Sequence, residues 1–311
     1  MQESTKGLLY CRLAMVLVGS TVVASRVIGQ DMEPFLATAL RHAMALPLFL
    51  ALMRATGARM PRPGRRDTLL LLVQAAAGSV GYTVLLILGV AASSAADAGV
   101  IAGTLPAVSA LFAVLALGER PSIRLATAIA LATAGVLAVS LAGGDGAPAA
   151  AHWRGHALVL AAVACEAVFI LANKRLREPV APLALSTLMS AGGLLLSLPA
   201  AWLAARGGPA HAWSAPALWG VAYYALLPTV AGFLLWYAGS QRVSGAAASL
   251  TTALLPVSAL LLSAVVLGET IRPGQWLGLG CVMLAVALSA GASPRPRTPA
   301  MPASPPSPSR P

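Results

Sequence analysis

Hydrophobic positions along this chain form long uninterrupted blocks, and short segments rich in Gly, Pro and charged residues separate them. A helix needs about 20 apolar residues to cross a bilayer, because each residue adds about 1.5 Å across a hydrocarbon core of about 30 Å. Ten blocks approach that length, and each is predicted to be one spanning helix: 9–28, 34–54, 68–90, 95–117, 122–142, 156–174, 182–204, 216–239, 244–267 and 273–291. The short segments between them leave no room for a soluble domain.

Two of the blocks are built alike, and each carries a proline near its middle. Each contains Leu-Pro and then Leu-Gly-Glu, and 150 residues separate each motif from its copy (105–106 and 255–256; 117–119 and 267–269). Proline removes one helical hydrogen bond and frees carbonyl groups, which inside a membrane must face protein or water. We therefore expect Pro106 and Pro256 to be a symmetric pair of hinges; the alternative is a static kink that helps packing.

The duplication extends over both halves of the chain. Pro34 and Pro182 open the second block of each half, 148 residues apart. Each half then holds five spans, and this odd number makes the second copy enter the membrane upside down relative to the first. The sequence predicts an all-α integral membrane protein of ten transmembrane helices, with two inverted five-helix repeats at 9–142 and 156–291 and an outer linker at 143–155.

The distribution of positive charge predicts the orientation of the chain. If the N-terminus is cytoplasmic, sixteen Lys and Arg residues fall on the cytoplasmic side and four on the outer side, with Arg41 left inside the second span. This positive-inside pattern predicts both termini in the cytoplasm, and it accounts for the net charge of +11 without nucleic acid. Five of the six tryptophans fall at the expected outer ends, as an interfacial belt does: Trp153, Trp202, Trp213, Trp219 and Trp276.

The two ends of the chain are predicted to be cytoplasmic tails. Residues 1–8 precede the first block, and residues 292–311 hold eight prolines in twenty positions, a composition that predicts disorder. The first block also imitates a secretory signal, since Lys6 and Arg12 precede its apolar run. We interpret it as the first helix, because its removal would leave nine spans and break the symmetry of the halves.

The paired motifs, together with ALRHAMALPLF at 39–49, resemble those of the drug/metabolite transporter superfamily, EamA type. Small residues seven positions apart follow each Gly-Glu, Ala128 and Gly135 in the first half and Gly278 and Ala285 in the second. The family tends to place glycine at both positions of such a pair, so this element is weakened here. The resemblance covers 9–291 and implies export or uptake of small metabolites, often amino acids or drug-like compounds, through a central cavity between the halves.

Charged residues inside the blocks are the first candidates for substrate binding or coupling. Glu166 lies near the middle of its block, where a carboxylate is costly unless it is protonated, paired or hydrated. We interpret it as a proton-coupling or substrate-amine site, with a structural carboxyl between helices as the alternative. Arg41 could pair with Glu166 or bind a substrate carboxylate, whereas the resemblance favours a role in helix packing.

Polar and aromatic faces supply the remaining candidates. Gln74 and Tyr82 lie on one face of the third block, and Trp236 and Tyr237 lie in the eighth. Aromatic and hydroxyl groups that line a concave apolar site can bind a small amphipathic solute. The alternative for each residue is ordinary packing between helices.

Absent motifs narrow the class of function. The sequence has no GxxxxGK[ST] for ATP, so transport would be facilitative or driven by a gradient, with the proton as a candidate coupling ion. An enzyme would need a clustered catalytic set, and the histidines are scattered along the sequence: His42, His152, His156 and His211.

The sequence therefore predicts a secondary transporter of the inner membrane, not an enzyme, that exports a small metabolite by alternating access. We expect the lipid bilayer and a small-molecule substrate as partners, with no cofactor, metal or nucleic acid. The alternative within the same fold is a flippase or exporter of lipid-linked or sugar-linked compounds. The oligomeric state stays open, because the GxxxG at 274–278 fits packing within the bundle as well as dimerisation.

Overall fold

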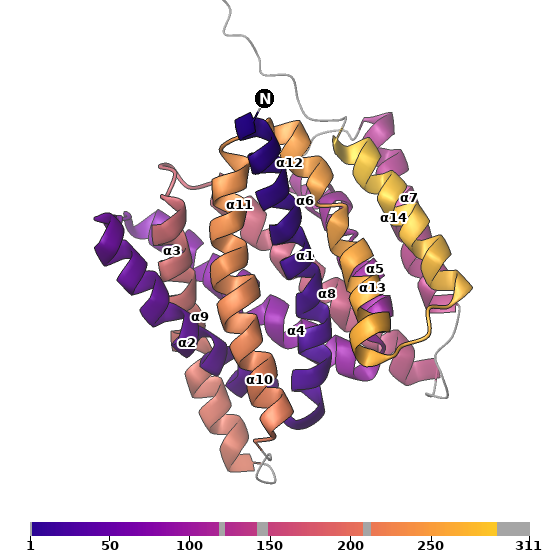
Figure 1. Ribbon diagram of the computed structural model, residues 1–311, viewed down its shortest axis with the longest axis horizontal. Helices are drawn as coiled ribbons and strands as arrows, with labels where there is room; N and C mark the ends of the chain where they lie inside the picture. The colour runs from indigo at the N-terminus through magenta and orange to yellow at the C-terminus, as the bar shows by residue number, and fades with distance from the viewer. Residues whose placement is uncertain (1, 118–121, 142–148, 208–212, 291–311) are drawn as a thin grey trace, which may run out of the picture.

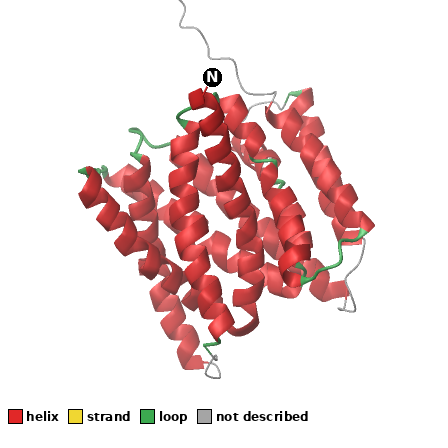
Figure 2. Ribbon diagram, viewed as in Figure 1, coloured by secondary structure: helices red, strands yellow, loops and turns green. Residues whose placement is uncertain are grey.

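The protein is described by a computed structural model over residues 2–117, 122–141, 149–207 and 213–290, and every regular element within these ranges is helical (Figure 2). Among these residues, seven helices are long and apolar enough to span a membrane, and an eighth span is added if one bent pair is counted as one. The last two expected spans hold shorter apolar helices, Leu254–Leu267 and Pro273–Ser289. The chain is thus a multi-pass helical membrane protein.

The helices of the first half follow the expected blocks closely. Their bounds are α1 Gln2–Asp31, α2 Pro34–Thr56, α3 Arg65–Gln74, η1 Ala75–Gly81, α4 Tyr82–Ala92, α5 Ala95–Ala102, α6 Leu105–Leu117 and α7 Ile123–Leu141. Helix α1 begins at Gln2, so most of the expected N-terminal tail belongs to the first helix. The elements α3, η1 and α4 follow one another without a gap and together fill the third block.

The second half repeats this order of elements. Their bounds are α8 Ala149–Lys174, α9 Pro182–Gly207, α10 Ala215–Tyr224, η2 Ala225–Gly232, α11 Phe233–Ser240, α12 Gly245–Thr251, α13 Leu254–Leu267 and α14 Pro273–Ala290. Helix α8 begins at Ala149, so the second part of the expected outer linker is helical. The expected tail at 292–311 lies outside the described residues.

The two blocks with the paired motifs, 95–117 and 244–267, are broken helices, not continuous ones. Helices α5 and α6 are bent by 44° at their break, and a break after Thr251 separates α12 from α13. Pro106 and Pro256 stand in the first turn of the helix that follows each break. Amides in that turn have no acceptor within their own helix, so neither proline removes a helical hydrogen bond. The expectation of a mid-helix proline was wrong in this respect.

One π-helical segment interrupts the third helix of each half. Segment η1 begins at Ala75 and η2 begins at Ala225, 150 residues apart, which is the spacing of the paired motifs. A π-helix widens the turn and leaves backbone carbonyls without their usual donors. Such segments are tolerated in a membrane where side chains of neighbouring helices reach the carbonyls.

Helices α7 and α14, the last helix of each half, run antiparallel where they touch. Helices α7 and α14 cross at Gly135 and Gly278, where a Cβ on either glycine would lie 3.0 or 2.9 Å from the carbonyl oxygen of the other. Ala128, seven residues before Gly135, and Ala285, seven residues after Gly278, belong to one buried cluster. Residue numbers therefore rise along one helix as they fall along the other. Figure 1 shows this pair at one side of the bundle and α2 with α9 at the other.

The two helix breaks meet inside the bundle. A Cβ on Gly103, which follows α5, would lie 2.7 Å from Cβ of Pro256 on α13, and a Cβ on Gly99 would lie 2.6 Å from Cβ of Ala259. Glycine is needed at both positions because any larger residue would force the backbones apart. This contact joins α5 to α13, again in antiparallel sense.

The outer surface of the bundle is apolar. Large side chains such as Val265 (81% exposed) and Leu195 (67% exposed) project from it, as expected of residues that face lipid. The five tryptophans predicted to form an interfacial belt are 45–75% exposed, whereas Trp236 is half-buried. Burial therefore separates Trp236 from the others, as the sequence interpretation did.

Candidate functional site

Arg41 is buried between α2 and η1. Its Nη2 donates to the carbonyl oxygen of Ser79 at 3.0 Å and lies 2.9 Å from Nε2 of His42. The guanidinium also lies over the ring of Tyr224, 4.7 Å from its centroid. The same Ser79 carbonyl accepts from the Thr83 hydroxyl at 3.1 Å. The widened turn of η1 thus presents a carbonyl that a charged side chain from another helix satisfies, which fits the packing role that the resemblance implies.

Glu166 and Tyr82 lie around this arginine. Both residues are within electrostatic reach of Arg41, as is Tyr224. Both side chains are partly buried and keep some solvent-accessible surface. In the described part of the chain, Glu166 and Arg41 form no direct ion pair. The structure therefore brings Arg41, Glu166 and Tyr82 together, but not as the direct pair that the sequence suggested.

Gln74 ends α3, immediately before η1. Its side chain is fully buried, and neither amide atom has a hydrogen-bond partner among the described residues. A buried amide without a partner costs about 1–3 kcal/mol, so such groups are retained mainly where something else uses them. Gln74 remains a candidate for polar recognition.

Trp236 and Tyr237 lie on α11. The ring of Tyr237 is 4.4 Å from that of Phe233, and Phe233 is in turn 5.8 Å from Phe49 on α2, edge to face. Tyr237 is thus part of an aromatic cluster with Phe233 and Phe49. Phe49 lies about two helical turns after Arg41 on α2. The structure does not bring it to the Arg41 group, and Trp236 lies beside it in the same helix.

Several polar contacts of the bundle were not foreseen from the sequence. Tyr224 lies under the Arg41 guanidinium, and the Tyr223 hydroxyl donates to Ser20 Oγ on α1 at 2.7 Å. Ser25, one further turn along α1, is fully buried and its hydroxyl has no partner among the described residues. The signal was present as hydroxyl residues at 20, 21 and 25 of the first block.

The second Gly-Glu motif joins the halves at one end of the bundle. Gly268 adopts the left-handed conformation, with φ of 69°, and ends α13. The carboxylate of Glu269 then accepts from the backbone amides of Ala95 and Ala96, the first residues of α5, at 3.0 and 2.8 Å. A carboxylate at a helix N-terminus satisfies free amides and the helix dipole together. The matching Glu119 lies outside the described residues.

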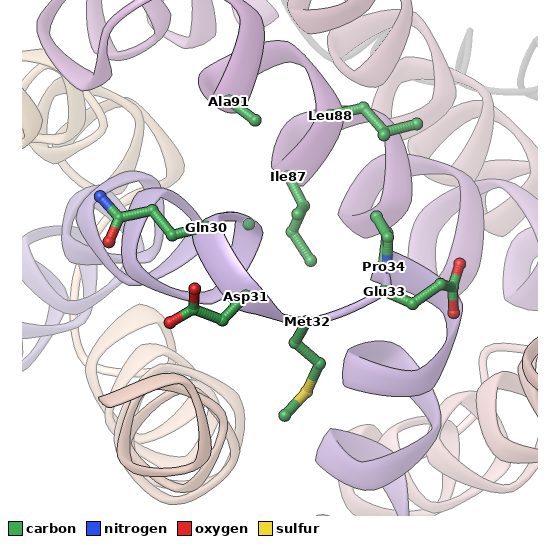
Figure 3. A pocket seen from close by; sticks show the side chains of 9 residues that line it. Gln30, Asp31, Met32, Glu33, Pro34, Ile87, Leu88 and Ala91 are labelled. Atoms are coloured by element: carbon green, nitrogen blue, oxygen red, sulfur yellow. The ribbon is translucent and has the colours of Figure 1, made fainter. Parts of the chain in front are cut away.

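A pocket of about 340 Å³ opens at the turn between α1 and α2 and is closed on the other side by α4 (Figure 3). Its polar lining comes from Gln30, Asp31 and Glu33. The Glu33 carboxylate is already engaged by the amides of Phe35 and Leu36 at 3.0 and 2.7 Å. None of the candidate residues named from the sequence lines this pocket.

These features define a multi-pass helical membrane protein whose polar groups are enclosed where its two halves meet. The chain belongs to the EamA-like transporter family, which matches residues 5–141 and again residues 153–291. The family thus occurs twice in the chain, once in each half.

Several named proteins are similar to this chain. It is 34% identical over 276 residues to the uncharacterized transporter YetK of Bacillus subtilis (strain 168), covering 87% of this chain and 82% of the relative. A protein of Streptantibioticus cattleyicolor, named a probable terminal-alkyne amino-acid exporter, is 30% identical over 72% of this chain and 74% of that one. A solved crystal structure with 21% identity has a TM-score of 0.63 over 91% of this chain and 97% of its own, and so shares the fold.

Proposed function

We propose that the protein is a secondary transporter of the inner membrane that exports a small metabolite by alternating access. Two inverted repeats of five helices would form ten spans, with the last two supplied by the α12–α13 pair and by α14. The observation that carries this proposal is the antiparallel contact of equivalent helices, with two helix breaks meeting at Gly103 and Pro256. Repeats related in this way can open to either side of the membrane with similar energy.

A further helix pair supports inversion. Helices α2 and α9 touch at His42 and Gly193, and again where Thr187 donates to the Met53 sulfur at 3.2 Å. The order of these contacts along the two helices is antiparallel, as it is for α5 with α13 and for α7 with α14. Rocking of one repeat against the other would then act on the contacts between these pairs.

The substrate site would lie around Glu166, Tyr82 and Arg41, and Gln74 would be a further polar group for recognition. Glu166 offers a carboxylate for an amine or a proton, and Arg41 offers a guanidinium for a carboxylate. A site with both charges fits an amino acid or a related zwitterion. The name of the Streptantibioticus relative agrees with this class, and Trp236 and Tyr237 would contribute an apolar wall further along the bundle.

The orientation proposed from the positive charges places the Glu269 contact on the outer side. The basic segments between α2 and α3 and between α8 and α9 then face the cytoplasm with both termini. The exposed tryptophans would form the outer interfacial belt. Labelling of single introduced cysteines on intact cells would test this: a cysteine at exposed Trp219 should react with an impermeant reagent, and one at Arg59 should not.

A thermal-shift screen tests the function directly. We expect amino acids or their derivatives to raise the melting temperature of the purified protein, since a ligand at 100 times its Kd stabilises the folded state by about 2.7 kcal/mol. Glu166→Gln and Trp236→Ala should weaken the shift. Trp219→Ala, which removes an indole that is 75% exposed, should leave it unchanged.

A second measurement distinguishes transport from binding. Proteoliposomes loaded with the hit compound should exchange it for external labelled compound, and Glu166→Gln should slow the exchange. Shifts obtained only with lipid-linked or sugar-linked compounds would overturn the proposed substrate class and favour a flippase. If protein-free liposomes exchange the labelled compound as fast as the proteoliposomes do, the proposal that this protein is a transporter is overturned.

A further inference from the structure

A cluster of buried titratable residues lies at one end of the bundle, apart from the Arg41 group. Asp97 stands in the first turn of α5 and is fully buried, and His152 and His156 stand four residues apart on one face of α8. The two imidazole rings lie 4.2 Å apart. Both rings come from the second half of the chain and the carboxylate from the first, so the cluster bridges the halves.

The distances within this cluster suit metal coordination. Oδ2 of Asp97 lies 3.5 Å from Nε2 of His152 and 3.3 Å from Nε2 of His156. Nε2 of His156 forms a hydrogen bond to Oδ2 that is longer than the usual range of about 2.7–3.2 Å, whereas Nε2 of His152 forms none among the described residues. Two atoms that each lie about 2.0–2.1 Å from a tetrahedral ion are about 3.3–3.4 Å apart. The three potential ligand atoms all lie within 4.8 Å of one another, so small rotations of the side chains suffice to bring them round one ion.

We propose that Asp97, His152 and His156 form a binding site for a divalent transition-metal ion, with Zn²⁺ as the preferred occupant. Two imidazole nitrogens and one carboxylate oxygen are a ligand set that suits Zn²⁺ and leaves a fourth position open. Mg²⁺ and Ca²⁺ prefer oxygen ligands and fit this set poorly. The sequence interpretation expected no metal because it treated these histidines as scattered.

His152 supplies an independent indication of a ligand. Its side chain is only 5% exposed, and its Nε2 has no hydrogen-bond partner among the described residues. A buried nitrogen aimed at a carboxylate without bonding to it is an unfavourable arrangement for a closed protein network. It becomes favourable when a cation lies between the two groups.

The neighbours of the cluster orient its ligands. Gln275 Nε2 donates to Oδ1 of Asp97 at 2.6 Å, which leaves Oδ2 to face the histidines. Ser140 Oγ lies 2.7 Å from Nδ1 of His156. When Nε2 of His156 binds an ion, Nδ1 carries the proton and donates to Ser140, which is how outer partners fix a metal-binding imidazole.

Arg272 is the competing cation at this site. Its Nη2 lies 3.3 Å from Oδ2 of Asp97, and its side chain is 18% exposed. The guanidinium must withdraw when an ion binds the same oxygen, and its partial exposure gives it a path to solvent. Removing this positive charge should therefore strengthen metal binding, whereas it should weaken a network that exists only as an ion pair.

The test is metal binding by the full-length protein, purified without a histidine tag and freed of metal by chelation. We expect Zn²⁺ at micromolar concentration to raise the melting temperature and Mg²⁺ to have no effect. His152→Ala and His156→Ala should abolish the Zn²⁺ shift, and Ser140→Ala should weaken binding by about 10–100-fold. Arg272→Gln should tighten it. His42→Gln is the matched control, since His42 is also a buried histidine but contacts Arg41 and the Ser79 carbonyl instead of Asp97; the Zn²⁺ shift of this variant should equal that of the wild type.

Co²⁺ provides a second readout that does not depend on stability. Bound to two imidazoles and a carboxylate, Co²⁺ should show the strong visible absorption of a tetrahedral site, and His152→Ala should lose it. The proposal is overturned if the wild-type protein gives neither a Zn²⁺ shift nor this absorption, or if both persist in His156→Ala. Loss of binding in Arg272→Gln would instead assign the cluster to a structural ion-pair network. These readouts involve no transport, so they stand apart from the proposed function.

Discussion

Replacement of Glu269 tests whether the Gly-Glu motif holds the two halves together. Its carboxylate binds two amides at the buried start of α5. Each amide left without a partner costs about 1–3 kcal/mol, and loss of the charge removes a helix-dipole interaction of about 0.3–1 kcal/mol. Glu269 is half-buried, so water can replace part of the loss. We therefore expect Glu269→Ala to lower the free energy of unfolding by about 2–3 kcal/mol, and Glu269→Gln, which keeps one acceptor, by about 1 kcal/mol.

Unfolding by SDS in mixed micelles, followed by circular dichroism, would measure these changes. Glu33 is the matched control, because its carboxylate also binds two amides at a helix start but caps its own helix, α2. Glu33→Ala should lower the free energy of unfolding by about 1 kcal/mol, as loss of a local cap does. The reasoning is refuted if Glu33→Ala is detectably destabilised while Glu269→Ala stays within about 0.5 kcal/mol of the wild type.

The remaining predictions concern the helix break and the central charges. Gly103→Ala should lower the free energy of unfolding by about 1–3 kcal/mol, because its Cβ would press on the α13 proline; Gly280→Ala, which has open space at its Cβ, should not lower it in the same SDS titration. Arg41→Lys should lower the free energy of unfolding by about 2 kcal/mol, because an ammonium can reach the Ser79 carbonyl but cannot also stack on the Tyr224 ring. Equal stability of this variant and the wild type would count against this account. Glu166→Gln should leave the melting temperature without ligand unchanged or higher, because the enclosed charge is removed, and should reduce the ligand-induced shift; a lower melting temperature without ligand would indicate a structural carboxyl.

The spanning helices were predictable from the sequence because their signal is local. A membrane leaves a buried backbone no partner but itself, so each long apolar block becomes a helix. The breaks were misjudged because proline fits two positions, mid-helix and the first turn, and the apolar pattern is the same for both. The π-helical segments were not foreseen, since a carbonyl in η1 finds its donor, Arg41, on another helix, and the local sequence does not show this contact.

The candidate site was predicted only in part for a similar reason. Glu166 and Arg41 stood out because a charge inside an apolar block is conspicuous in one dimension. Asp97 lies near the end of its block and so attracted no notice. His152 was assigned to a linker, which hid its spacing of four from His156 on one helix face. An earlier start for α8 would have revealed the pair.

The Glu269 contact also has a consequence for how the chain is made. The amide of Ala95 and the carboxylate that satisfies it are 174 residues apart. A ribosome that adds roughly 5–20 residues per second needs about 9–35 s to cover that distance. Throughout this interval the first two amides of α5 lack the carboxylate that accepts their hydrogen bonds. We expect the insertion machinery to shelter this end until the second half arrives, and translation that stops before residue 269 to yield a product that cells degrade.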